Sequence, residues 1–121
     1  MAGETGNPLI DRTLKVFTEE FGQPEPATNK KVSRWLLRPS IGVVVQLDQP
    51  RKQGAYIWVP FPAGAPAPTS AHEVYPADKG RHSGTNAVPG LEGGKPAVKL
   101  IVESETALAE AVQYIKARAR M

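Results

Sequence analysis

Strand-like segments cluster in the middle of this chain, and one helical segment lies towards each end. Amphipathic spacing predicts helices over residues 8–21 and 105–118. Alternating apolar residues predict strands over 31–38, 41–48, 55–60, 72–75 and 97–102. Because the strands do not alternate with helices, the pattern predicts an α+β fold. We expect an antiparallel or mixed sheet of four to five strands, with the N-terminal and C-terminal helices packed on one face.

Local signals mark where the two helices begin and end. Asn7 is a suitable N-cap and Pro8 suits the first helical position, whereas Gly22 is a natural C-terminal cap. Ser104 caps the second helix in the same way. Basic residues end that second helix, as its dipole favours: Lys116, Arg118 and Arg120.

The length of the chain predicts one domain over residues 1–121. Two irregular segments interrupt it, a proline-rich connection at 60–71 and a long Gly/Pro loop at 76–96. The first is expected to run as extended surface chain. A structureless segment as long as the second is uncommon in a small domain unless it is functional or disordered, so 76–96 is a candidate functional region.

Composition excludes several classes of protein. The chain has no cysteine, which rules out disulfides, thiolate metal sites and a cysteine nucleophile, and fits the cytoplasm. The start of the sequence does not resemble a signal peptide, and no apolar run is long enough to span a membrane, so we expect no membrane partner.

Basic residues concentrate in one stretch of the sequence. Residues 27–60 hold six Lys and Arg side chains against one Asp, although the whole chain has a net charge of only +3. If Trp35 points into the core, alternation turns Arg34 and Arg38 outward. A basic surface of this kind favours an anionic partner. The candidate nucleic-acid-binding residues are Arg34, Arg38, Arg51, Lys52, Lys79 and Arg81.

These features predict a small non-enzymatic binding module that contacts DNA or RNA through a basic sheet face and the glycine-rich loop. Tyr56 and Trp58 lie on one face of the same strand and are candidates for stacking on bases. Burial as ordinary core aromatics is the alternative for these two rings.

Two other functions remain open. The proline-rich segment and a free sheet edge favour a protein-interaction or assembly module, including a homo-oligomer. A small enzyme is the other alternative, built around a loop site of His72, His82 and Lys95, with Asp78 close by.

No catalytic or cofactor motif supports the enzyme directly. Residues 90–96, GLEGGKP, lack the spacing of a phosphate-binding loop, and Pro96 stands where Ser or Thr would open a helix. The chain has neither a nucleophile elbow nor the HExxH pattern. We therefore expect no cofactor and no metal.

Overall fold

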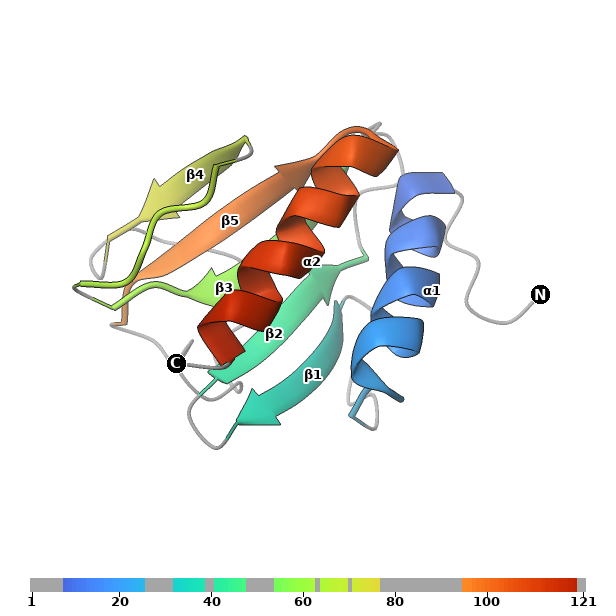
Figure 1. Cartoon of the computed structure of the whole chain (residues 1–121), viewed down its shortest axis with the longest axis horizontal. Coiled ribbons are helices and arrows are strands. Elements are labelled where there is room, and N and C mark those ends of the chain that lie inside the picture. Colours follow the sequence, from blue (N-terminus) through green and yellow to red (C-terminus); the bar gives the residue numbers. More distant parts are fainter. Residues whose placement is uncertain are drawn as a thin grey trace.

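In the computed structural model, the described part of the chain folds into two helices and five strands (Figure 1). The elements are α1 (Pro8–Phe21), β1 (Val32–Arg38), β2 (Ile41–Gln46), β3 (Ala55–Pro60), β4 (His72–Tyr75), β5 (Ala97–Val102) and α2 (Glu105–Ala119). The structure describes residues 8–25, 32–38, 41–47, 54–62, 64–69, 71–76 and 95–119, apart from the side chain of Arg38. The expected α+β fold class is confirmed.

The five strands form one antiparallel sheet in the order β1-β2-β3-β5-β4. The predicted strand bounds hold to within two residues, and the second strand ends at Gln46 instead of Asp48. A register shift between Leu36 and Arg38 marks a bulge at the end of β1. The last strand in the sequence, β5, lies between β3 and β4. The sheet is therefore completed by pairings of β5 with strands that are distant along the chain.

Helix α1 follows its sequence signals. It begins at Pro8 and buries Ile10, Thr13 and Phe17. It ends at Phe21. The next residue, Gly22, has a φ of 87°, in the left-handed region that a C-terminal cap requires, and its N–H donates to the carbonyl oxygen of Thr18 at 3.0 Å. The predicted N-cap, Asn7, lies outside the described residues.

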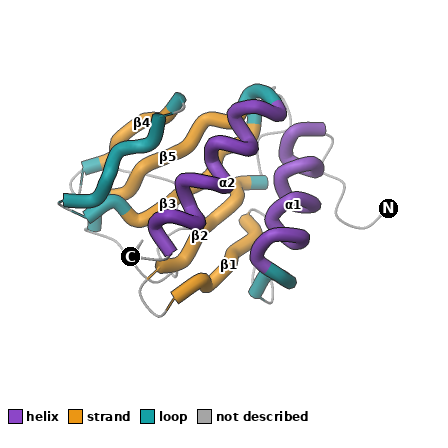
Figure 2. Tube along the Cα trace, in the orientation of Figure 1, coloured by secondary structure: helices purple, strands orange, loops and turns teal. Residues whose placement is uncertain are grey.

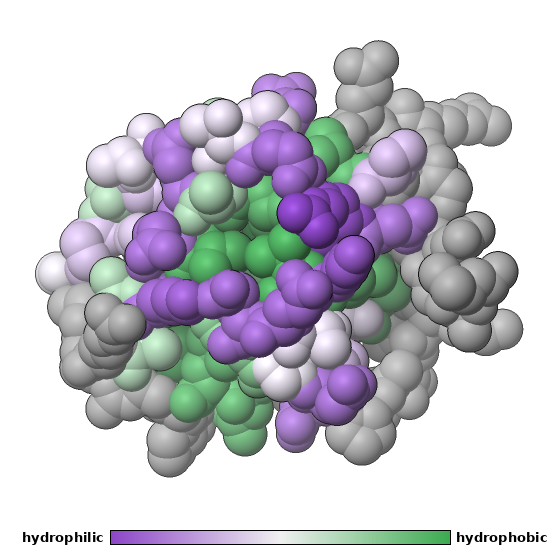
Figure 3. All heavy atoms as spheres, turned by 45° about the vertical axis from the view of Figure 1, so that its right-hand side comes forward, coloured by the Kyte–Doolittle hydropathy of each residue, from purple (hydrophilic) through white to green (hydrophobic). Residues whose placement is uncertain are grey.

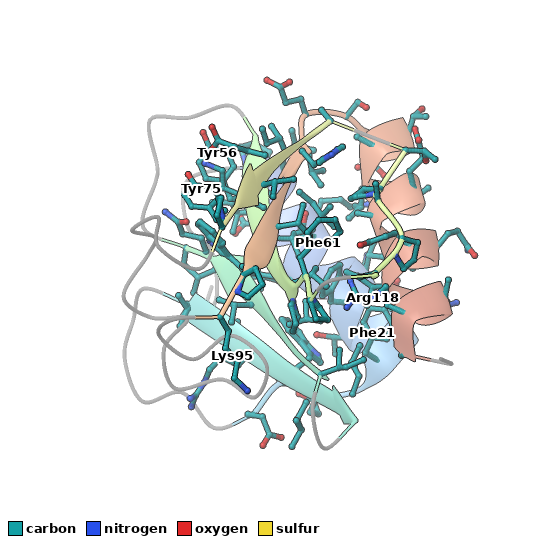
Figure 4. All side chains as sticks on the ribbon, turned by 90° about the vertical axis from the view of Figure 1, so that its left-hand side faces the viewer. Phe21, Tyr56, Phe61, Tyr75, Lys95 and Arg118 are labelled. Atoms are coloured by element: carbon teal, nitrogen blue, oxygen red, sulfur yellow. The ribbon has the colours of Figure 1, made fainter. Side chains whose placement is uncertain are left out.

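Both helices pack on the same face of the sheet (Figures 1 and 4). Trp35, Val43 and Ile57 lie on that face and contact apolar residues of the helices in one core cluster. Residues of α2 complete the cluster at helical spacing: Leu108, Ala111, Val112 and Ile115. Seen from the helix side, hydrophilic residues cover much of the described surface, with hydrophobic residues visible between them (Figure 3).

The connection from β3 to β4 runs as a loop beside α2 (Figure 2). The hydroxyl of Tyr114 donates to the carbonyl oxygen of Pro66 at 2.7 Å, and the hydroxyl of Thr69 donates to Glu110 at 3.4 Å. Pro68 is buried. Most described residues of this proline-rich segment are exposed, and side chains of α2 hold it in place.

Of the long Gly/Pro loop at 76–96, only Pro76, Lys95 and Pro96 are described. The prediction that this loop carries function is thus not tested by the structure. Neither helix in the described ranges is long and apolar enough to cross a membrane.

Candidate functional site

The face of the sheet opposite the helices carries its own set of side chains. Strand alternation and the pairing register place them there. Tyr56 and Tyr75 point away from the side that holds Phe21, Phe61 and Arg118 (Figure 4). We call this surface the helix-free face, and its central side chains are Arg34, Val44, Gln46, Tyr56, Trp58, Glu73, Tyr75 and Lys99.

One row of residues crosses the helix-free face from edge to edge. The register pairs Arg34 with Val44, Val44 with Trp58, Trp58 with Lys99, and Lys99 with Glu73. With strands about 4.8 Å apart, the Cα atoms of Arg34 and Lys99 are roughly 14 Å apart, on either side of Val44 and Trp58. Two cations thus flank an apolar and aromatic centre.

Three aromatic rings surround the ammonium group of Lys99. Its Nζ lies 4.3 Å from the ring centroid of Tyr56, 5.3 Å from that of Tyr75 and 5.7 Å from that of Trp58. The same atom donates to the hydroxyl of Tyr75 at 3.1 Å and lies 3.1 Å from a carboxylate oxygen of Glu73. The Lys99 side chain is only 13% exposed, so these contacts hold the cation in one place.

The surroundings of Lys99 favour its charged form. Burial lowers the pKa of an ammonium group, but hydrogen bonds and charge attraction from Tyr75 and Glu73 outweigh burial and raise the pKa of Lys99 above its usual 10.5. Lys99 is therefore a permanent cation near neutral pH. It is suited to electrostatic contact and unsuited to nucleophilic chemistry, which needs the neutral amine.

Trp58 stabilises the arrangement of aromatic rings around Lys99. It is only 2% exposed, and its indole Nε1 donates to the side-chain oxygen of Gln46 at 3.0 Å. Its ring meets that of Tyr75 edge-on, with centroids 4.8 Å apart. Trp58 packs with Val32, Val44 and Ala97 in a second, smaller buried cluster. Trp58 is therefore a buried core aromatic, which was the alternative to base stacking. Tyr56 and Tyr75 are half-buried and reach the surface.

The nucleic-acid-binding residues expected from the sequence are only partly described. Trp35 points into the core, and the half-buried Arg34 lies on the helix-free face, as the alternation predicts. The backbone of Arg38 pairs with Ile41 at the end of β1. Outside the described residues lie Arg51, Lys52, Lys79 and Arg81.

The structure separates the two described members of the proposed loop site. His72 lies on β4 opposite Leu100 and is half-buried, whereas Lys95 is exposed just before β5 begins. Five residues of extended chain separate Leu100 from Lys95, which is roughly 17 Å. His82 and Asp78 lie outside the described residues, so the enzymatic alternative stays a prediction.

Sequence reasoning missed Lys99, Glu73 and Tyr75. Alternation with Val98 and Leu100 already turned Lys99 away from the core, but no local pattern showed which strand lay beside β5. The cluster forms because β4 and β3 flank β5, and this strand order depends on long-range pairing.

Comparisons add no family to this description. Within the described residues, no group of three or more His, Cys, Asp or Glu side chains could hold a metal ion. No protein-family model matches the chain, and no significant match is found among curated proteins or solved structures.

Proposed function

We propose that this protein is a non-enzymatic module that binds single-stranded nucleic acid on the helix-free face. The observation that carries the proposal is the row from Arg34 to Lys99, with the rings of Tyr56 and Tyr75 beside the second cation. Cations that contact phosphates, combined with aromatic rings that stack on bases, are the features of sequence-tolerant single-strand binding.

The distribution of charge along the row favours one orientation of a bound, anionic nucleic-acid backbone. Glu73 offsets part of the charge of Lys99, because the two groups form an ion pair. Arg34, at the other end of the row, and the exposed Lys95 add positive charge. Phosphates therefore lie towards β1 and the beginning of β5, while bases lie on Tyr56 and Tyr75. A cytoplasmic location accompanies this proposal and is supported by the absence of cysteine.

Fluorescence anisotropy with labelled oligo(U) and oligo(dT), measured at several salt concentrations, tests the proposal. The logarithm of the affinity should fall linearly with the logarithm of the salt concentration. Arg34→Gln should make the slope shallower by about 0.7, the value for one phosphate contact on a single strand. Tyr56→Leu should cost about 1–3 kcal/mol of binding with little change of slope.

Arg12→Gln is the matched control. Arg12 is a cation of the helix layer, and its exposed side chain pairs with Glu105 at 3.0 Å. This variant should bind as the wild type does. Absence of binding at low salt, or equal losses in Arg12→Gln and Arg34→Gln, would remove the proposal.

A second candidate function is assembly through the edge of β4. Val74, on this edge strand, is 43% exposed, and the exposed apolar residue of the opposite edge strand is Leu36, at 47%. The opposite edge strand is partly covered, since the N–H of Glu25 donates to the carbonyl oxygen of Arg34 at 2.8 Å. A second copy of the chain that pairs at β4 would cover Val74.

Light scattering over a range of protein concentrations tests this assembly. The wild type should form dimers as the concentration rises, and Val74→Lys should remain monomeric because a charge on the edge strand opposes pairing. A wild type that remains monomeric at all concentrations contradicts the assembly.

A further inference from the structure

The side-chain amide of Gln46 is held in one orientation by Trp58. The indole Nε1 of Trp58 donates to Oε1 of Gln46 at 3.0 Å. Because an indole N–H can only donate, the atom of the amide that faces Trp58 must be its oxygen. Trp58 is only 2% exposed, and leaving a buried N–H without its acceptor is unfavourable. The amide therefore keeps its oxygen on the indole nitrogen and turns its NH₂ group away from it.

Gln46 lies beside Tyr56 on the helix-free face. The recorded pairing of β2 with β3 joins Val44 to Trp58. Two residues further along β2, the same antiparallel register places Gln46 opposite Tyr56. Facing side chains of an antiparallel pair have Cβ atoms about 4.5–5.5 Å apart. Gln46 and Tyr56 are both half-buried, so each keeps surface that a ligand can reach.

The strand that carries Tyr56 lies between the strand of Gln46 and the strand of Lys99. On the β5 side, Nζ of Lys99 lies 4.3 Å from the ring centroid of Tyr56. A base that stacks on Tyr56 therefore has an ammonium group on one side and an amide on the other. The ammonium group attracts the phosphates of every nucleotide alike, whereas the neutral amide is placed to contact the edge of the base, which differs between nucleotides.

We infer that Gln46 makes the helix-free face selective for bases that carry a carbonyl oxygen where other bases carry an amino group. This inference rests on the function proposed above. Uracil, thymine and guanine present the carbonyl oxygen, which accepts a hydrogen bond from the NH₂ group of Gln46. Cytosine and adenine present an amino group, which is itself a donor and cannot accept one. The preferred ligand is thus a single strand rich in the first three bases.

Fluorescence anisotropy with oligo(dU) and oligo(dC) of equal length tests the selectivity. Uracil and cytosine have nearly the same size, and they differ on the edge where one has a carbonyl and the other an amino group. Wild type should bind oligo(dU) about two- to tenfold more tightly, the range for one net hydrogen bond. Both titrations use the same salt concentration, because salt alone changes the affinity steeply. A mildly alkaline buffer keeps the cytosines neutral.

Gln46→Glu should reverse this preference. A carboxylate still accepts the hydrogen bond of Trp58 through one oxygen, but its second oxygen is an acceptor where Gln46 has a donor. The added negative charge should weaken binding of both strands, while oligo(dC) becomes the tighter ligand of the two. A purely structural role of Gln46 would weaken both strands by the same factor. Gln113→Glu makes the same chemical change at an exposed position of α2 and should keep the wild-type ratio.

The outcomes separate this inference from the proposed function. If wild type binds both strands equally, or if Gln46→Glu keeps the wild-type ratio, the selectivity is overturned while single-strand binding stands. If wild type binds neither strand at low salt, both are overturned. Should Gln46→Glu fail to fold, Gln46→Met takes its place. Methionine has no N–H donor, so this variant should bind the two strands equally, and a wild-type ratio would again overturn the inference.

Discussion

The indole Nε1 of Trp35 donates a hydrogen bond of 2.8 Å to the carbonyl oxygen of Gly22, and this bond joins β1 to the end of α1. The two residues are 13 positions apart. The ring of Trp35 also meets that of Phe17 edge-on, with centroids 5.3 Å apart. One side chain of the sheet therefore satisfies a carbonyl at the end of the helix and fills the core beneath it.

Trp35→Phe should destabilise the protein more than Trp58→Phe. Both changes remove the same atoms and one indole donor. In Trp35→Phe, the carbonyl oxygen of Gly22 loses its hydrogen-bond donor and cannot move, because it is fixed at a helix end. In Trp58→Phe, the side chain of Gln46 also loses its donor, but it can rotate to another hydrogen-bond partner. The unsatisfied carbonyl should add about 1–3 kcal/mol to the loss. Urea unfolding of the two variants measures the difference, and equal losses would contradict the argument.

Two glycines should respond differently to the same substitutions. A Cβ on Gly54 would lie 2.8 Å from the carbonyl oxygen of Val102, so Gly54→Ala forces β3 and β5 to shift. Gly22 has open space around it, and only its positive φ resists a side chain. Each alanine variant should cost about 1–3 kcal/mol.

Asparagine substitutions should distinguish the positive φ that limits Gly22 from the steric clash that limits Gly54. Asparagine tolerates the left-handed region better than alanine does, but it does not relieve a clash. Thermal unfolding should show Gly22→Asn to be more stable than Gly22→Ala. Gly54→Asn should be no better than Gly54→Ala. A rescue by asparagine at Gly54 would show that space is not what limits this position.

The Lys99 cluster should make stability sensitive to high pH. Its pKa is raised in the folded state, so the contribution is complete below the unfolded value of 10.5 and is lost as the pH rises through the folded value. Tyrosines titrate in the same range, so the comparison needs Lys99→Met as a reference. Between pH 9 and pH 12, the unfolding free energy of the wild type should fall more steeply than that of the variant. Parallel curves would contradict the raised pKa.

Two substitutions on α1 should differ greatly in their effect on stability. Phe17 is fully buried between Phe21 and Trp35, and Phe17→Ala should cost about 3–5 kcal/mol. Arg12 forms an exposed ion pair, and Arg12→Gln should change stability by less than about 0.5 kcal/mol. Chemical denaturation checks both values. A large loss in Arg12→Gln would disqualify it as the control for nucleic-acid binding.

Local patterns were enough to predict the elements of this fold. Alternation identified β2 and β3, and the cap at Gly22 fixed the end of α1, because these features depend on neighbours within a few residues. The orientation of Trp35 and Arg34 followed from the same alternation. The order of the strands could not be predicted from alternation, because β5 pairs with both β3 and β4 across long stretches of chain.

The candidate sites were harder to predict for the same reason. The side chains around Lys99 come from three strands, and only the assembled sheet brings them together. In the helix layer, the dipole of α2 explained a cation at Arg118 but gave no sign that it would be buried. Arg118 donates to the Tyr114 hydroxyl, which donates in turn to the carbonyl oxygen of Pro66, and helical periodicity does not encode this contact with a distant segment.

The position of β5 has a consequence for synthesis. As the chain leaves the ribosome, β1, β2 and β3 emerge first and can associate, but β3 has one side without its neighbour and β4 has no neighbour at all. Both wait for residues 97–102 to emerge. The nascent protein therefore carries an open strand edge from the emergence of β3 until the emergence of β5, and a ribosome that stalls shortly before Ala97 would leave that edge available to other chains.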